Sequence, residues 1–270
     1  TEIVYGDTDS IFVNFHPTDS QGKPLLQLEG LKETIRIGID FEHYIQPFLK
    51  FPHRLEYEKT FSQFILFGKK RYLGLKSEFD PNVAKMTAMG IVLKRRDNAK
   101  ILKAVYDGVI QQFMAGNGPH AAAEYLQSCL YRLIKGKYPL EMLVITKTLK
   151  PESSYVNPTG VAHLVLAKRM GERDPGNRPQ SNDRIPYVFI VTNQKKPLQG
   201  DRIEHPDYVR EQNIPIDYEY YITNQIQKPV QQIFDLVPNF NSQHLFMPIL
   251  RKIRNQKNGQ ISMEAFTRTF

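Results

Sequence analysis

The chain has 270 residues, of which 41% are hydrophobic, so it is long enough to bury the core of one large domain or of two modest ones. Its 36 basic residues outnumber the 28 acidic ones, and the net charge of +8 favours a polyanionic partner. Nucleic acid is the first candidate, because the sequence has no Lys/Arg-rich amphipathic helix with the bulky apolar face that binds acidic membranes. The single cysteine, Cys129, excludes an internal disulfide framework and a Cys-rich zinc site.

Neither a membrane span nor a secretion signal is predicted. No run of about 18 apolar residues occurs, and the N-terminus has neither a charged leader nor a small-residue cleavage site. We therefore expect a soluble, intracellular protein with no membrane partner, in which Cys129 is a buried structural thiol. Because the first residues already alternate as a strand does, we also expect a C-terminal fragment of a longer protein.

The N-terminal third predicts an α+β unit. "EIVY" and "SIFVNF" are β-like runs joined by the turn-prone "GDTD", so Asp7 and Asp9 are expected at the tip of a hairpin. "RLEYEKTF", "FILFG" and "KKRYLGL" predict further strands, since they are rich in aromatic and β-branched residues. Between them, a helix that ends near Pro52 is predicted from apolar residues at helical spacing: Leu31, Ile35, Ile39, Ile45 and Leu49.

The remainder of the chain is predicted to be mainly helical. Asp97 or Asn98 is expected to cap a helix that ends at Gly116, and Pro119 opens another that ends at Gly136. "LVITKTL" and "IPYVFIVT" interrupt these helices as strands. The segment 170–184 is rich in Gly, Pro, Asn and Asp and predicts a loop, and a helix that Pro229 kinks or splits is predicted from Asp217.

The two aspartates of "GDTD" admit several interpretations. They can simply favour the turn through local hydrogen bonds, which is the ordinary role of aspartate there. A calcium EF-hand loop is excluded, because Phe12 and Thr18 occupy the positions that require Gly and Glu. A D-x-D pair that binds a divalent ion together with a nucleotide sugar, as in many glycosyltransferases, remains open from these two residues alone.

The motifs around these aspartates resemble those of a known protein family. "YGDTDS" resembles motif C of B-family DNA polymerases, and five further segments follow in that family's order. They are "LEYEKTF" at 55–61, "KKRY" at 69–72, "MGIVLKRRDNA" at 89–99, and the thumb-like segments 173–188 and 204–230. The thumb segments resemble delta-type enzymes, and "PQSNDRIPY" is most like the form in large nucleocytoplasmic DNA viruses. "YEK" stands where the family often has "FEK", and no cysteine-rich module follows, as expected for a viral member or a truncated sequence.

This resemblance implies an α+β fold. Residues 1–96 would form the C-terminal part of an antiparallel polymerase palm with packed helices, and residues 97–270 a mainly α-helical thumb. It implies template-directed addition of deoxynucleotides to a primer 3′ end with two Mg²⁺ ions, for which Mn²⁺ can substitute. Asp9 would be the direct metal ligand, with Asp7 beside the site. Glu58 would point to the same cluster, although a glutamate on a surface strand is an equally good interpretation.

The basic motifs imply contacts with DNA. Minor-groove acceptors occur at every base pair, so a basic side chain there can test base-pair geometry without reading sequence. If "KKRY" is a strand, Lys69 and Arg71 face one way and Lys70 and Tyr72 the other. In "KRRDN" the cations can neutralise phosphates while the next residues begin a helix. The DNA-binding residues implied are Lys69, Lys70, Arg71, Tyr72, Lys94, Arg95, Arg96 and Asn98.

The expected partners are primer-template DNA, deoxynucleoside triphosphates, a processivity factor, and the rest of the polymerase chain with motif A, fingers and exonuclease. Because motif A and the fingers are absent, this chain alone is expected to be inactive. A viral member would act in the host nucleus or in a cytoplasmic viral factory. The alternative from another class is a non-catalytic module that binds duplex DNA as a clamp, and an upstream motif A would distinguish the two.

Overall fold

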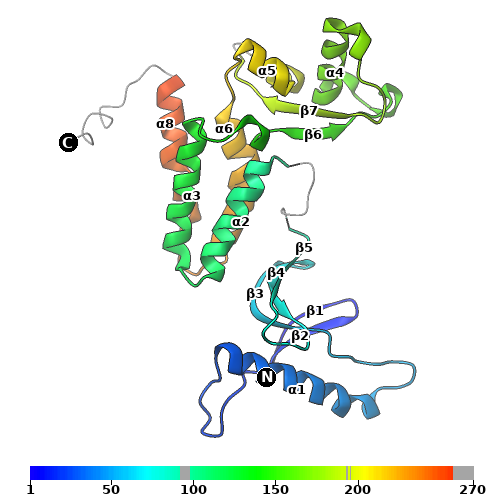
Figure 1. Ribbon diagram of the computed structural model, residues 1–270, viewed down its shortest axis with the longest axis vertical. Helices are drawn as coiled ribbons and strands as arrows, with labels where there is room; N and C mark the ends of the chain where they lie inside the picture. The colour runs from blue at the N-terminus through cyan, green and yellow to red at the C-terminus, as the bar shows by residue number, and fades with distance from the viewer. Residues whose placement is uncertain (92–97, 193, 195, 258–270) are drawn as a thin grey trace, which may run out of the picture. The chain divides into compact units, whose positions relative to one another are not determined.

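The computed structural model describes residues 1–91, 98–192, 194 and 196–257. The chain divides into two compact units, Thr1–Ile91 and Val92–Phe270 (Figure 1). The boundary predicted after residue 96 lies outside the described residues. Both units combine antiparallel sheets with helices, which confirms the predicted α+β class. Within the described part of the chain, no helix is both long and apolar enough to cross a membrane.

The N-terminal unit contains a two-stranded and a three-stranded antiparallel sheet. The first is the hairpin of β1 (Glu2–Asp7) and β2 (Ser10–Asn14), and the second has the order β3-β4-β5. The remaining elements are α1 (Gln27–Ile45), the 3-10 helix η1 (Gln46–Phe48), β3 (Thr60–Gly68), β4 (Arg71–Ser77) and β5 (Lys85–Met89). The predicted hairpin and the helix that ends before Pro52 are therefore confirmed.

An aromatic cluster joins the two sheets of this unit. Phe12 of β2 has its ring centroid 5.3 Å from that of Phe64 and 5.4 Å from that of Tyr72, on β3 and β4. Tyr5 of β1 and Phe61 of β3 complete the cluster. Offset and edge-on ring pairs stabilise such a core beyond the area that they bury. The cluster therefore fixes the β1-β2 hairpin on the larger sheet.

The strand predicted for "RLEYEKTF" is wrong before Thr60. Residues 54–59 form no strand, because tertiary contacts hold their backbone to α1. The Tyr57 N–H donates a 2.8 Å hydrogen bond to the Glu42 carboxylate of α1. A Cβ at Gly38 would lie 2.7 Å from the Tyr57 ring, so the glycine allows this close approach.

The C-terminal unit combines a helical group with a three-stranded antiparallel sheet of order β6-β7-β8. Its helices are α2 (Lys100–Met114), α3 (Gly118–Ile134), α4 (Ala162–Arg173), α5 (Pro206–Gln212), α6 (Tyr218–Tyr220), the π-helix η8 (Tyr221–Gln227), α7 (Lys228–Phe234) and α8 (Met247–Lys257). Its strands are β6 (Ile145–Thr148), β7 (Arg184–Phe189) and β8 (Ile203–Glu204). Short 3-10 helices lie at Leu140–Met142, Glu152–Ser154, Pro158–Gly160, Pro175–Asn177, Gln199–Arg202 and Ser242–Leu245.

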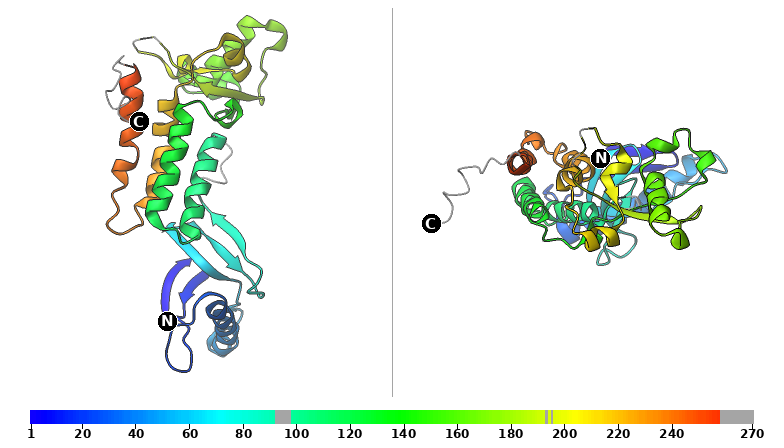
Figure 2. Two further views of the ribbon diagram at one scale, coloured as in Figure 1. Left: turned by 60° about the vertical axis from the view of Figure 1, so that its left-hand side comes forward. Right: turned by 90° about the horizontal axis from the view of Figure 1, so that it is seen from above.

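The helices α2 and α3 lie side by side, α8 packs on α3, and η8 and α7 pack on α2 (Figures 1 and 2). Their contact faces are apolar and fully buried, with Val109 from α2 and Leu126 from α3. The predicted ends of α2 and α3 are confirmed, because Gly116 and Gly136 follow them with φ of 75° and 63°. Cys129 is buried, as expected.

Two predictions for this unit need correction, and a third is confirmed. Asn98 does not cap α2, since Ala99 takes the N-cap position and no side chain caps the helix; Asp97 lies outside the described residues. The predicted loop 170–184 begins too early, because α4 continues to Arg173, which pairs with the buried Glu204 at 2.9 Å. The helix predicted from Asp217 is split near Pro229 as expected, because the π-helix η8 ends at Gln227 and α7 begins at Lys228, with Pro229 in its first turn, where the missing N–H is tolerated.

Candidate active site

The tip of the β1-β2 hairpin presents both predicted aspartates. Asp7 pairs with Ser10 at the end of the ladder, and Thr8 and Asp9 form the two-residue connection. Thr8 has a φ of 56°, and the Asp9 N–H donates to the Asp7 carbonyl at 2.6 Å. The Ser10 hydroxyl donates to the same carbonyl at 3.1 Å. The backbone of this tip is therefore held by its own hydrogen bonds.

A second hairpin tip belongs to "KKRY". Gly68 and Arg71 form the last pair between β3 and β4, so Lys69 and Lys70 are the connection and only Arg71 and Tyr72 are on a strand. The predicted strand alternation is therefore wrong for the two lysines. Gly68 has a φ of 149° and Lys70 a φ of 57°, values that turn the chain here.

The two tips meet through Lys70. Its ammonium lies 2.9 Å from Oδ1 of Asp7 and 3.4 Å from the Thr8 hydroxyl. The hydrogen bond from Lys70 is the largest cause that lowers the pKa of the Asp7 carboxyl, with smaller contributions from Thr8 and Tyr5. The same bond is the largest cause that raises the pKa of Lys70. The Asp7 side chain is 16% exposed and that of Lys70 62%, so the pair lies at the edge of solvent.

Asp9 differs from Asp7 in its surroundings. The residue is exposed, and its carboxylate forms no hydrogen bond or ion pair with the residues that the structure describes. Its charge still contributes to the raised pKa of Lys70, as the smallest of the causes. One hairpin tip thus carries two different carboxylates. The charge of Asp7 is neutralised by Lys70, whereas the oxygens of Asp9 are free to accept a ligand.

The structure does not bring Glu58 into this arrangement. Glu58 lies before β3, is 72% exposed, and pairs with the neighbouring Lys59 at 2.5 Å. Across residues 1–91, 98–192, 194 and 196–257, no three His, Cys, Asp or Glu side chains gather closely enough to hold a metal ion. Asp9 and Asp7 therefore form no three-carboxylate cluster with Glu58 here, and its proposed role stays a prediction.

The other predicted DNA-binding residues have different surroundings. Lys69 is exposed in the turn, Arg71 is half-buried at the start of β4, and Tyr72 belongs to the aromatic cluster. Asn98 is half-buried before α2. Lys94, Arg95 and Arg96 lie outside the described residues, so their contacts with phosphates stay a prediction.

Two residues of the site were missed from the sequence, Tyr5 and Thr8. The Tyr5 hydroxyl accepts a 2.8 Å hydrogen bond from the Lys70 backbone N–H, and the Thr8 hydroxyl donates to Asp7 Oδ1 at 3.0 Å. A signal for Tyr5 was present, because residues two apart on a strand share a face, and Tyr5 precedes Asp7 by two. Thr8 gave no comparable signal, since its left-handed conformation is unusual for a β-branched residue.

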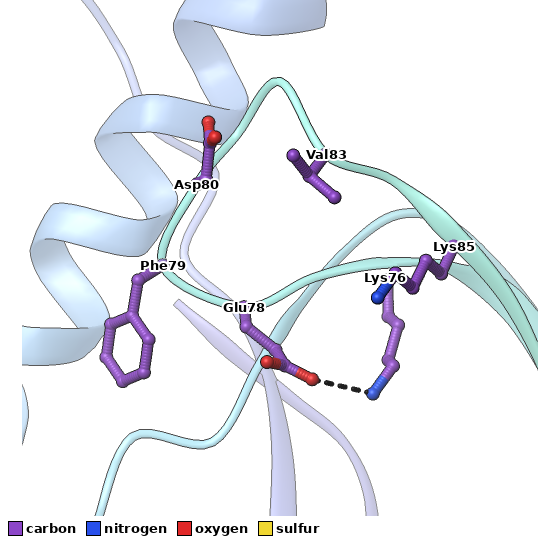
Figure 3. Close-up of a pocket in the computed structure, with 6 residues that line it drawn as sticks. All are labelled: Lys76, Glu78, Phe79, Asp80, Val83 and Lys85. Carbon is purple, nitrogen blue, oxygen red and sulfur yellow. Dashed lines mark hydrogen bonds and ion pairs between the residues drawn. The ribbon is translucent and has the colours of Figure 1, made fainter.

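A shallow hollow of about 280 Å³ lies at the other end of β4 (Figure 3). Its lining residues are Lys76, Glu78, Phe79, Asp80, Val83 and Lys85. Lys76 forms an ion pair with Glu78 at 2.9 Å, and the Phe79 ring packs edge-on against Tyr57. The hollow is separate from the two hairpin tips, because β4 places Ser77 and the KKRY turn at its opposite ends.

Comparison with known proteins identifies the family. The family model described as DNA polymerase family B matches residues 1–237. The chain belongs to DNA polymerase family B. The family predicted from "YGDTDS", "KKRY" and the later motifs is therefore confirmed, and the two hairpin tips are parts of a B-family chain.

Relatives of this family B chain include viral and cellular polymerases. It is 48% identical over 237 residues to a DNA polymerase of Pyramimonas orientalis virus and 42% identical over 268 residues to one of Acanthamoeba polyphaga mimivirus. It is 35% identical over 235 residues to the DNA polymerase delta catalytic subunit of Glycine max. These alignments cover 87%, 97% and 87% of the chain but 19%, 15% and 20% of the relatives. The chain thus spans about a fifth or less of their length.

Proposed function

We propose that this chain is part of a DNA-directed DNA polymerase that adds deoxynucleotides to the 3′ end of a primer on a DNA template. Family membership and relatives named as DNA polymerases support this reaction class. Because the chain spans about a fifth or less of those relatives, the activity belongs to the longer protein. The chain supplies the two hairpin tips of the proposed active site.

The observation that carries the proposal is the unequal state of the two tip carboxylates. Mg²⁺ prefers hard oxygen ligands, and the exposed Asp9 carboxylate has its lone pairs open. Asp7 is a poorer ligand, because the Lys70 ammonium already lies at its Oδ1. Asp9 thus fits the direct ligand, and the remaining oxygen ligands would have to come from outside this chain.

Bound Mg²⁺ supplies positive charge that lowers the pKa of the primer 3′-hydroxyl and stabilises the charge developing on the α-phosphate and the leaving pyrophosphate. Asp9 would hold the ion at a fixed place, because the hydrogen bonds of Asp7, Thr8 and Ser10 hold the backbone of the tip. The neighbouring Asp7–Lys70 pair has no net charge. The negative charge of the tip is therefore that of Asp9, and a cation is attracted to Asp9 more than to Asp7.

The KKRY turn is proposed to face the primer-template duplex. Lys69 is exposed and Lys70 retains 62% exposure, so both ammonium groups can donate to groove or backbone acceptors. Minor-groove acceptors are common to all base pairs, so such contacts depend on base-pair geometry and not on the base sequence. That indifference is what a copying enzyme requires. The net charge of +8 adds a sequence-independent attraction to DNA.

The proposed function is tested with the intact polymerase on a labelled primer-template. Each of the four templating bases is presented in turn with all four deoxynucleoside triphosphates separately and Mg²⁺. We expect one nucleotide to be added, complementary to the template each time. Binding of the duplex without incorporation would contradict the proposal and favour a non-catalytic clamp. The 270-residue chain alone is expected to add no nucleotide, because it spans so little of its relatives.

A further inference from the structure

The Tyr5 hydroxyl lies where the two hairpin tips meet, and the residue belongs to neither tip. It accepts the backbone N–H of Lys70 at 2.8 Å. It also contributes, as the smallest of the causes, to the lowered pKa of the Asp7 carboxyl. One hydroxyl therefore holds the main chain of the lysine and influences the charge of its ion-pair partner.

The Tyr5 ring is held in place independently of this hydrogen bond. Its centroid lies 5.4 Å from that of Phe12 and 6.4 Å from that of Tyr72, within the aromatic cluster. Removal of the hydroxyl alone leaves this packing intact. The aromatic cluster thus sets the position of the Tyr5 hydroxyl oxygen, and the Lys69–Lys70 turn is placed relative to that oxygen.

Lys70 needs such a contact because its backbone is in a costly conformation. Its φ of 57° is in the left-handed region, which a residue with a Cβ adopts only at an energetic cost. A hydrogen bond to the N–H of that residue favours the conformation over its extended alternatives. This backbone conformation in turn directs the side chain to Asp7, where the ammonium lies 2.9 Å from Oδ1.

We propose that Tyr5 is a positioning residue whose hydroxyl fixes the Lys70 turn, so that the ammonium pairs with Asp7 and Asp9 remains the open carboxylate. This inference rests on the proposed function, since it states how the proposed ligand is kept distinct from its neighbour. The hydroxyl acts through Lys70, whose backbone N–H it accepts. Because Lys70 is exposed, water can satisfy its N–H when the hydroxyl is lost, so the effect is on orientation more than on folding.

A double-mutant cycle in the intact polymerase tests this role. Single-turnover incorporation is measured for wild type, Tyr5→Phe, Lys70→Ala and the double variant. We expect Tyr5→Phe to slow incorporation about tenfold and the double variant to be no slower than Lys70→Ala, because coupled residues are not additive. If the two losses multiply, Tyr5 does not act through Lys70 and the inference is wrong. Wild-type incorporation by Lys70→Ala would also overturn it.

Hydrogen exchange gives a readout that does not depend on activity. The backbone N–H of Lys70 is expected to exchange faster in the intact Tyr5→Phe polymerase than in wild type. The matched control is Tyr57→Phe, which removes a hydroxyl of the same unit that donates to the Glu78 carbonyl at 2.7 Å. It should leave exchange at Lys70 and the incorporation rate unchanged. Unchanged Lys70 exchange in Tyr5→Phe would overturn the inference, whereas the proposed function is judged separately by template-directed incorporation with the intact wild-type polymerase.

Discussion

The Lys70 ammonium lies 2.9 Å from Oδ1 of Asp7, and this ion pair joins the tips of two hairpins that are far apart in the sequence. It lowers the pKa of Asp7 and raises that of Lys70. The Asp7 contribution to stability is present above its ordinary pKa of 3.8 and is lost as pH falls through the lowered value. The Lys70 contribution to stability is present below its ordinary pKa of 10.5 and is lost as the pH rises through the raised pKa. The pair is therefore charged throughout the neutral range.

This pairing changes the expected salt dependence of DNA binding. Lys70 is one of the DNA-binding residues that the sequence motifs implied, and an unpaired cation that contacts phosphate makes the affinity depend on salt. Since the Lys70–Asp7 pair is neutral overall, Lys69 is the turn residue that should release a counterion. Lys69→Ala should reduce the slope of log affinity against log salt by about 0.9, the value for one phosphate contact. Binding of primer-template by the intact polymerase from low to high salt measures this slope.

The matched control for Lys69→Ala is the double variant Asp7→Asn/Lys70→Met, which removes one charge of each sign from the neighbouring position. We expect it to leave the slope unchanged even where it weakens binding. A slope reduced equally by both variants would show that Lys70 contacts phosphate with an uncompensated charge. An unchanged slope in Lys69→Ala would remove Lys69 from the proposed duplex contacts.

The stability of the C-terminal unit should depend on pH through His163. Burial is the largest cause that lowers the pKa of this imidazole below 6.5, and the charge of Lys147 adds to it. As the pH falls below 6.5, the unfolded chain therefore binds a proton that the folded unit resists, and the unfolding free energy falls. We expect the 270-residue chain to melt at a lower temperature at pH 5 than at pH 7.5. His163→Gln should reduce this difference in melting temperature. If the difference stays the same, groups other than His163 cause it.

The packing of α2 on α3 should not tolerate a side chain at Gly108. A Cβ there would lie 2.1 Å from the Tyr125 hydroxyl and 2.2 Å from its Cζ. Overpacking costs about 1 to 3 kcal/mol, and a contact this short belongs at the upper end of that range, above the roughly 1 kcal/mol that alanine gains over glycine in a helix. Gly108→Ala should therefore lower the urea midpoint with little change in m. Lys100→Ala, at an exposed position of α2, serves as control, and a raised midpoint in Gly108→Ala would contradict the prediction.

Features set by local chemistry were predictable from the sequence. The "GDTD" turn, and the ends of α2 and α3 at Gly116 and Gly136, depend on turn propensity and on the left-handed conformation of glycine. The failures occur where distant residues decide. Tyr57 is held out of a strand by Glu42 on α1, and α4 extends to Arg173, where the buried Glu204 of β8 holds its last turn. No local pattern encodes either contact.

The candidate site shows the same division. Asp7 and Lys70 were both assigned to it from motif resemblance, and the geometry at the hairpin tip agrees with the predicted turn. Their direct pairing depends on the aromatic cluster, which fixes one hairpin on the other and involves residues from β1, β2, β3 and β4. The turn at Lys69 and Lys70 was missed because an alternating run does not reveal where it reverses.

The unequal surroundings of the two tip carboxylates predict unequal effects of matched substitutions. Asp9→Asn removes a charge from the open carboxylate at nearly constant size, so metal occupancy and transition-state stabilisation should both decline. A loss of roughly 4 kcal/mol, about a thousandfold in rate, is expected. Asp7→Asn removes the partner of Lys70 and leaves Asp9 in place, so a loss of about tenfold is expected, or roughly 1.4 kcal/mol. Single-turnover incorporation by the intact polymerase across a Mg²⁺ titration measures both.

The Mg²⁺ dependence separates a ligand from a neighbour. Asp9→Asn should require more Mg²⁺ for half-maximal rate and should recover in part with Mn²⁺, whereas Asp7→Asn should keep a Mg²⁺ requirement close to that of wild type. Both variants should keep the wild-type melting temperature, because asparagine is as well suited as aspartate to a hairpin turn. Equal shifts of the Mg²⁺ requirement in the two variants would mean that Asp7 also binds the ion in spite of its ion pair with Lys70. Near-normal incorporation by Asp9→Asn at saturating primer-template would leave both aspartates with no role beyond forming the turn.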